Sequence, residues 1–125
     1  MKIERKGELS SYSMEEKGNF FVVSGKGLFK AEDAKNYIKD FKDITRQLPT
    51  RTMELVINTF ELKTSFQDVN ELIGEMTELY RSTPFLKKHM VMPVAKTALM
   101  QIKRQDPTGF LDTLNFVSDL NELIK

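Results

Sequence analysis

The feature that most constrains the fold is a change of hydrophobic period that recurs along the chain. Residues 20–23, Phe-Phe-Val-Val, are apolar without alternation, as in a strand that is buried on both faces. From residue 31 to residue 48 the apolar residues instead recur about every 3.6 positions, which predicts an amphipathic helix that Pro49 ends. Further apolar runs at 53–58 and 88–92 are each followed by a helical pattern. Such alternation indicates parallel β-α-β units with right-handed crossovers.

The segments outside this pattern complete the predicted order β-β-α-β-α-β-α-β-α. Residues 8–15 form a polar strand, antiparallel to the next strand and at an edge of the sheet, with a hairpin turn at 17–19. If each later strand lies beside its predecessor, the helices fall mainly on one face. The fold class is therefore α/β, with a mostly parallel sheet. The second and third helices are expected at 66–83 and 94–103, the third with Leu99 and Ile102 inward.

The C-terminal segment is compatible with two structures. Residues 112–117 could belong to one long terminal helix, but their apolar and β-branched side chains favour a last strand. Ser118 or Asp119 would then cap a closing helix that runs through Ile124.

Composition limits the classes of function. A chain of 125 residues, 40% apolar and 30% charged, predicts one globular domain over residues 1–125. The formal charge of +1 predicts neither nucleic-acid nor membrane binding, and the absence of cysteine excludes thiolate chemistry. The N-terminus lacks the apolar core of a signal peptide, and no apolar run is long enough to span a bilayer. We therefore expect a cytoplasmic protein.

Three segments together resemble the SpoIIAA-like family of STAS domains, which have the anti-sigma-factor antagonist fold. They are NFFVVSGKGLFKAEDAKNYI, the following MELVINTFEL, and the terminal LNFVSDLNELIK. The resemblance covers residues 7 to 125 and rests on hydrophobicity and turn residues. It implies a non-catalytic regulatory module that binds a protein partner.

In the antagonists of this family, the loop after the central strand carries an Asp-Ser-Ser-Gly-like sequence, and a partner kinase phosphorylates the serine at the start of the next helix. An ungapped comparison places Gln67 and Asp68 at the serine positions and Val69 at the glycine. The phosphoserine motif is therefore missing. We predict that Thr64 or Ser65 caps the second helix, with Asp68 in its first turn favoured by the helix dipole. Phosphorylation of Thr64 or Ser65 is the alternative, and it requires a different loop length.

The charged residues are segregated. Residues 79–105 contain no acidic side chain, whereas the preceding helix carries an acidic stripe of Asp68, Glu71, Glu75 and Glu78. This pattern predicts a solvated surface with ion pairs between helices, and a docking face for a protein partner is the alternative. The candidate interaction residues are Thr64, Ser65, Asp68, Glu71, Lys87, Lys88 and Lys96.

No catalytic, metal-binding or cofactor-binding constellation is predicted. His89, the only histidine, is expected to be a partly buried strand residue, and its use as a general base is the least favoured reading. Ser24-Gly25-Lys26-Gly27 lacks the spacing of a phosphate-binding loop. The other class of function left open is a small-molecule or lipid carrier whose pocket is lined by Phe66, Met90, Met92 and Met100.

Overall fold

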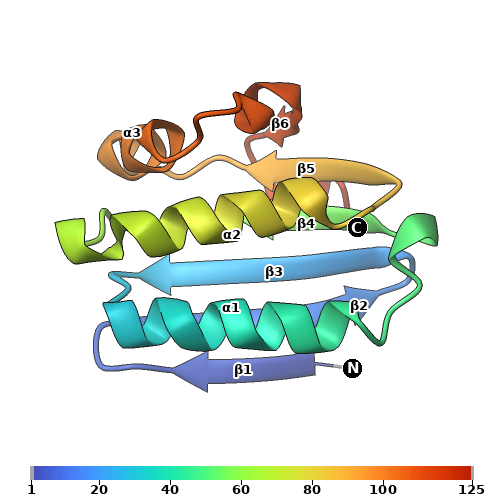
Figure 1. Cartoon of the computed structure of the whole chain (residues 1–125). Helices are drawn as coiled ribbons and strands as arrows, with labels where there is room; N and C mark the ends of the chain where they lie inside the picture. Colours follow the sequence, from blue (N-terminus) through green and yellow to red (C-terminus); the bar gives the residue numbers. More distant parts are fainter. Residues whose placement is uncertain (1, 125) are drawn as a thin grey trace.

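The computed structural model of the chain describes residues 2–124 and shows a six-stranded sheet whose strands lie in their order of sequence (Figure 1). The first two strand pairs are antiparallel and the other three are parallel. The predicted mostly parallel α/β sheet is thus confirmed. The strands are β1 (Lys2–Lys6), β2 (Ser10–Lys17), β3 (Phe20–Gly27), β4 (Glu54–Asn58), β5 (Lys87–Val91) and β6 (Asn115–Val117).

Three helices connect the parallel strands and cover one face of the sheet. They are α1 (Ala31–Thr45), α2 (Asn70–Ser82) and α3 (Lys96–Arg104). Because every crossover joins neighbouring strands with the same hand, successive helices lie on the same side, and Figure 1 shows α1 and α2 in front of the sheet. In α3, Ala98 and Ile102 are buried whereas Leu99 is half-buried. The prediction that the helices lie mainly on one face is confirmed.

Alternate residues of the central strands pack into two separate clusters. Phe21, Leu55 and Met90 point toward the helices and belong to the main core. Val22, Val56 and Val91 point to the opposite face, where the C-terminal turn covers them with Leu120, Leu123 and Ile124. The central strands are therefore buried on both faces, which explains why their sequences lack alternation.

The N-terminal edge differs from the prediction. The sequence predicts residues 8–15 as the edge strand, but the edge strand is β1, and β2 lies between β1 and β3. β1 pairs with β2 from Lys2↔Glu15 to Lys6↔Ser11. In β1, Lys-Ile-Glu-Arg-Lys, only Ile3 packs against the core. A strand so rich in charge carries almost no hydrophobic signal, and its charges protect the exposed edge from pairing with other chains.

The C-terminal segment agrees with the strand interpretation, with different bounds. The strand covers only Asn115–Val117, after a 3-10 turn at Phe110–Thr113, and the alternative of one long terminal helix is wrong. The expected closing helix is a single 3-10 turn, Leu120–Glu122. Asp119 caps it by accepting a hydrogen bond from the Asn121 amide at 2.8 Å, as one of the two predicted caps.

Asp40 of α1 holds the two N-terminal strands to the helix layer. Its carboxylate accepts hydrogen bonds from Arg5 Nε at 3.0 Å and from Tyr12 Oη at 2.7 Å. Burial raises the pKa of Asp40, but the two donors outweigh burial and keep this pKa below its usual value of 3.8.

A lowered pKa in the folded state predicts a loss of stability in acid. The contribution of Asp40 is fully present above its unfolded-state pKa and is lost as the pH falls through the folded-state pKa. We expect the free energy of unfolding to decrease below about pH 4, and less steeply in Asp40→Asn than in the wild type. Urea denaturation across this range measures both slopes, with Asp43→Asn as the exposed control on the same helix. Equal slopes for Asp40→Asn and the wild type would contradict this role.

Gly27 ends β3 where only glycine fits. Its φ is +76°, and a Cβ there would lie 2.3 Å from the carbonyl oxygen of Leu9. Gly18 has a similar φ of +60° but open space around its Cα. We expect Gly18→Ala to cost roughly 1–2 kcal/mol from backbone strain alone, and Gly27→Ala to cost at least about 1 kcal/mol more because Leu9 must move. Chemical denaturation of Gly18→Ala and Gly27→Ala measures the two losses of stability, and their difference is the cost of the contact with Leu9. Equal losses would show that this contact costs nothing.

Candidate interaction surface

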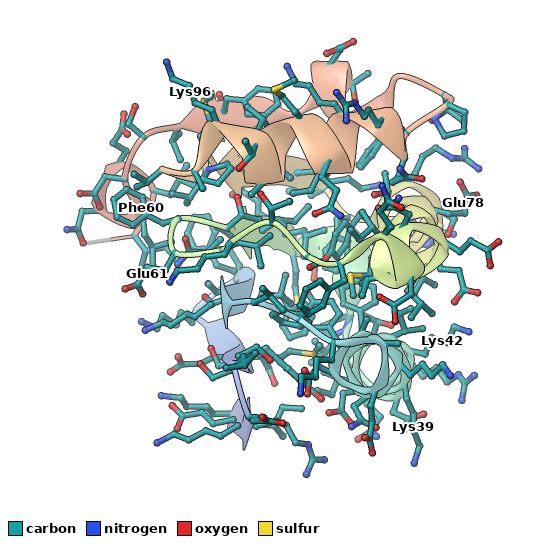
Figure 2. All side chains as sticks on the ribbon, turned by 90° about the vertical axis from the view of Figure 1, so that its left-hand side faces the viewer. Lys39, Lys42, Phe60, Glu61, Glu78 and Lys96 are labelled. Atoms are coloured by element: carbon teal, nitrogen blue, oxygen red, sulfur yellow. The ribbon has the colours of Figure 1, made fainter. Side chains whose placement is uncertain are left out.

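Four loops meet at the end of the sheet where the parallel strands finish. Backbone hydrogen bonds join them in a row: Leu28 N–H to Leu9 O, Gly27 N–H to Glu61 O, and Val94 N–H to Phe60 O, with N to O distances of 3.0, 3.0 and 3.1 Å. The loops therefore form one continuous surface, and Figure 2 looks onto this end, with Phe60, Glu61 and Lys96 labelled.

The exposed apolar side chains gather at this end. Of the seven large apolar side chains that are exposed within residues 2–124, six lie on these loops or on the adjoining first turns of α3. The seventh, Leu86, immediately precedes β5 at the opposite end and is 61% exposed. Single exposed apolar residues are common, but a cluster of them indicates a binding surface. We call the six residues the carboxyl-end patch: Leu9, Phe60, Phe66, Met92, Val94 and Met100.

Two residues of the patch, Phe60 and Val94, line an open hollow of about 510 Å³. Phe60, Leu62 and Val94 contribute its apolar wall, and the charged rim includes an ion pair between Lys26 Nζ and Glu61 Oε2 at 3.1 Å. The surface is thus indented, which allows a protruding side chain of a partner to be enclosed rather than only covered.

The loop that follows β4 is held by α3. Gln101 accepts a hydrogen bond from the Ser65 amide at 2.8 Å and donates to the Ser65 carbonyl and to Asn70 Oδ1, both at 3.0 Å. Thr64 Oγ1 donates to Thr97 Oγ1 at 2.6 Å. These contacts fix the backbone that carries Phe66.

The predicted helix cap is wrong. A 3-10 turn, Gln67–Val69, precedes α2, and neither this turn nor α2 receives a side-chain cap. Thr64 and Ser65 therefore lie too far from the helix start, and the contacts of both residues are made with α3 instead. Asp68 does lie in the 3-10 turn and Glu71 in the first turn of α2.

The acidic stripe is exposed, as its spacing predicts, but it does not form the expected ion pairs between helices. Asp68, Glu71, Glu75 and Glu78 are all exposed. Within residues 2–124, only Glu78 of these four forms an ion pair, and its partner Arg81 lies on the same helix. The Arg81 guanidinium lowers the pKa of Glu78 by hydrogen bonding.

No protein-family model and no curated protein matches the sequence. The structure is similar to the crystal structure of an anti-sigma factor antagonist from Mycobacterium paratuberculosis, with a TM-score of 0.63 and 15% sequence identity over 90% of this chain and 89% of that chain. The chain has the SpoIIAA-like fold of anti-sigma-factor antagonists. This likeness confirms the fold expected from the three sequence segments, and at this identity it concerns the fold alone.

On this antagonist fold, the predicted candidate residues divide between two places. Thr64, Ser65, Asp68, Glu71 and Lys96 come together at the carboxyl end, because β4, α2 and α3 place the ends of their connecting loops there. Lys87 and Lys88 begin β5 and lie at the opposite end.

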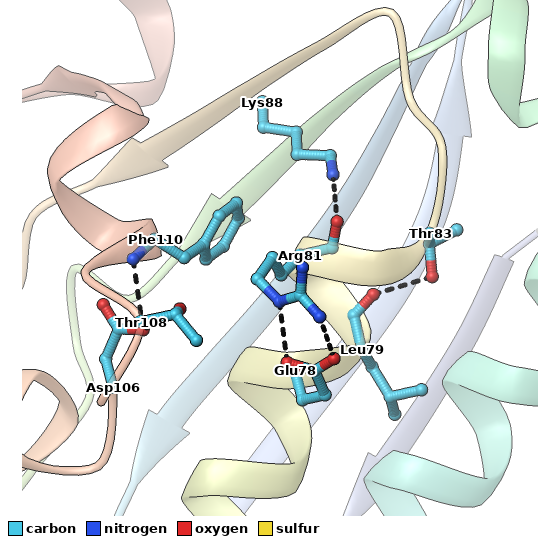
Figure 3. A network of polar contacts seen from close by, with 8 residues as sticks. All are labelled: Glu78, Leu79, Arg81, Thr83, Lys88, Asp106, Thr108 and Phe110. Atoms are coloured by element: carbon cyan, nitrogen blue, oxygen red, sulfur yellow. Dashed lines mark hydrogen bonds and ion pairs between the residues drawn. The ribbon is translucent and has the colours of Figure 1, made fainter.

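Lys88 has a structural role, shown in Figure 3. Its ammonium donates to the carbonyl oxygen of Arg81 at 2.9 Å and lies 5.4 Å from the centre of the Phe110 ring. It thereby satisfies a carbonyl at the C-terminus of α2. Burial, with a smaller effect from Arg81, lowers the pKa of Lys88. The ammonium of Lys88 is therefore held by contacts within the fold, and Lys88 does not belong to the carboxyl-end patch.

His89 is a buried strand residue, in agreement with the sequence, and is 5% exposed. Asn115 Nδ2 donates to its Nδ1 at 2.9 Å, so Nε2 carries the proton and donates to Glu54 Oε1 at 2.7 Å. A carboxylate is in reach, as a general base requires, but both ring nitrogens are engaged. The histidine lines neither the hollow at the carboxyl end nor the cavity between the sheet and the helices.

The alternative pocket is not assembled as the sequence suggests. Phe66, Met92 and Met100 are exposed, and only Met90 is buried and faces a cavity inside the fold. Residues 2–124 contain no cluster of metal-ligating side chains. None of the helices in this part of the chain is long and apolar enough to cross a bilayer.

Sequence reasoning does not find the carboxyl-end patch. Phe66 and Val94 are the first residues of the predicted second and third helices, and Phe60 lies outside any periodic segment, so no pattern groups the three as one exposed patch. The available signal is their position: each follows shortly after an apolar strand, and the carboxyl ends of parallel strands meet at one edge of a sheet.

Proposed function

We propose that residues 1–125 form one regulatory domain that binds a partner protein through the carboxyl-end patch and performs no catalysis. The observation that supports this proposal is the concentration of six of the seven exposed large apolar side chains of residues 2–124 at one end of the sheet, where Phe60 and Val94 line a hollow. The structural neighbour is named as an antagonist of an anti-sigma factor. We propose that the partner of this domain is likewise a regulatory protein, of the kind that such an antagonist binds.

The patch has enough apolar surface to support such a complex. Burial of a Phe, Val or Met side chain contributes about 1.5–3 kcal/mol, so several anchors together can exceed the cost of association. At its edge, Lys63 and Lys96 are exposed and form no ion pair within residues 2–124. Asp68 and Glu71 at the same end are also exposed and form no ion pair within residues 2–124. We therefore expect the partner to present apolar anchors flanked by side chains of both charges.

Docking through this patch needs no phosphorylation of Thr64 or Ser65. The Thr64 hydroxyl is bound to Thr97, and Asp68 brings a permanent negative charge to the start of the following turn. We expect phosphopeptide mapping of the protein from its native host to show both residues unmodified in every growth condition. A phosphate on either residue, together with loss of partner binding, would replace this account with a switch.

Site-specific photo-crosslinking tests the proposed function. A benzophenone amino acid at Val94, which is 69% exposed, is expected to link one native protein in the host cell. The same group at Leu86, at the opposite end, is the matched control and should give no such product. The captured protein must then form a complex with the wild-type domain when both are purified. Equal adducts at both positions, or no complex between the purified proteins, would contradict the proposal.

A further inference from the structure

A cavity lies beneath the loop that follows β4, between the sheet and the three helices. Its volume is about 70 Å³, and it is partly open to solvent. Most of the lining is apolar, contributed by strands and helices together: Val23, Ile57, Met90, Ile73, Met76 and Ile102. It lies toward the carboxyl ends of the parallel strands, where α/β folds commonly bind ligands.

Most of the polar side chains in the lining have hydrogen-bond partners. Tyr37 and Tyr80 share a hydrogen bond between their hydroxyls. Thr59 donates to the Val91 carbonyl at 2.7 Å and Thr77 to the Ile73 carbonyl at 2.9 Å. The two hydroxyls carry two O–H donors, so one tyrosine hydrogen has no hydrogen-bond acceptor within residues 2–124. A buried water needs at least about two polar partners, so this largely apolar interior still favours an apolar occupant over ordered water.

One cation belongs to the lining. Lys63 is exposed, and its ammonium forms no ion pair within residues 2–124. Its backbone is fixed, because the Lys63 amide donates to the Gly27 carbonyl at 3.0 Å. An anionic group at the mouth of the cavity could pair with this ammonium while an attached apolar group enters.

The volume sets the size of that apolar group. An engineered apolar cavity of about 150 Å³ accommodates the six carbons of benzene. The 70 Å³ found here is about half of that volume, which corresponds to roughly three or four carbon atoms. A long lipid tail does not fit.

We propose that the cavity binds the short branched tail of a small aliphatic carboxylate, with the carboxylate at Lys63. This site adjoins the carboxyl-end patch, because Lys63 lines both the cavity and the hollow of the patch. Gly25 lines the cavity alone, and Phe60 and Val94 line the hollow alone, so variants at these positions let either assignment fail without the other.

The probe is isovalerate, a carboxylate with a four-carbon branched tail. In a titration of the full chain followed by NMR of its methyl groups, we expect shifts of the Ile57 and Ile73 signals with a dissociation constant in the millimolar range, typical of such a small ligand. Isovaleramide, which has the same tail and no charge, should bind at least about fivefold more weakly because it cannot pair with Lys63.

Two variants assign the site. Lys63→Gln should weaken isovalerate binding to the level of the amide, whereas Lys87→Gln, at the far end of the sheet, should leave it unchanged. Gly25→Ala adds a Cβ at 3.4 Å from the Phe29 ring and 3.7 Å from Leu62 Cδ1, which is ordinary contact, and it should reduce binding at least about tenfold by filling part of the cavity. If the methyl signals do not shift even at isovalerate concentrations far above the millimolar range, the cavity holds only water and the proposal is overturned. Binding unaffected by both Lys63→Gln and Gly25→Ala would overturn it equally.

Discussion

Replacing Phe41 with alanine is expected to lower the free energy of unfolding by about 3–5 kcal/mol. Phe41 is 1% exposed, and its ring meets Phe21 of β3 at 6.1 Å and Tyr80 of α2 edge-on at 5.4 Å between centroids. Removal of the ring leaves a void where α1, α2 and the sheet meet, and the surrounding side chains can close it only in part. Since small domains are stable by about 5–15 kcal/mol, this single change removes a large share of the total.

Urea denaturation followed by circular dichroism measures this loss. Phe60→Ala is the matched control, because it deletes the same ring at a position that is 43% exposed. Its effect should stay within about 0.5 kcal/mol. Similar losses for Phe41→Ala and Phe60→Ala would show that the core is not centred where α1 and α2 cross the sheet.

The part of the fold that follows from the sequence is the part where packing imposes a period. β3, β4 and β5 contribute residues to the clusters on both faces, so β3 and β4 contain continuous apolar runs and β5 ends in a shorter one, Met90-Val91. The helices α1 and α2 each bury one stripe. These elements appear within a few residues of their predicted bounds. The order of the strands follows as well, because short right-handed crossovers place neighbours in sequence side by side.

What could not be predicted depends on contacts between distant residues. Strand β1 is held by pairing with β2 and by the Arg5–Asp40 bond, and neither leaves a hydrophobic pattern. Ser65 is bound by Gln101, which lies 36 residues later, and no local rule favours this bond over a helix cap. The carboxyl-end patch combines residues from three separate loops and from α3, so it exists only once the sheet has formed.

The second large effect concerns the patch itself. Phe60 and Val94 line the same hollow, and their loops are joined by the Val94 N–H to Phe60 O bond. In the double substitution Phe60→Asp and Val94→Asp, two carboxylates would have to lose water in the complex without a partner for their charge, and two apolar anchors would be missing. We expect affinity for the partner protein to fall at least about a hundredfold, which corresponds to about 2.7 kcal/mol. Both residues are exposed, so the free domain should keep its stability within about 1 kcal/mol.

The most direct test is calorimetric titration with the partner that the crosslinking identifies. The purified partner is titrated into the wild type, the double variant and Leu86→Asp, which measures whether the loops at the carboxyl ends of the strands form the docking surface. Equal affinity for the wild type and Leu86→Asp, with affinity at least about a hundredfold lower for the double variant, is the predicted result. Affinity that is unchanged in the double variant, or lost equally in Leu86→Asp, would place the binding surface elsewhere on the domain.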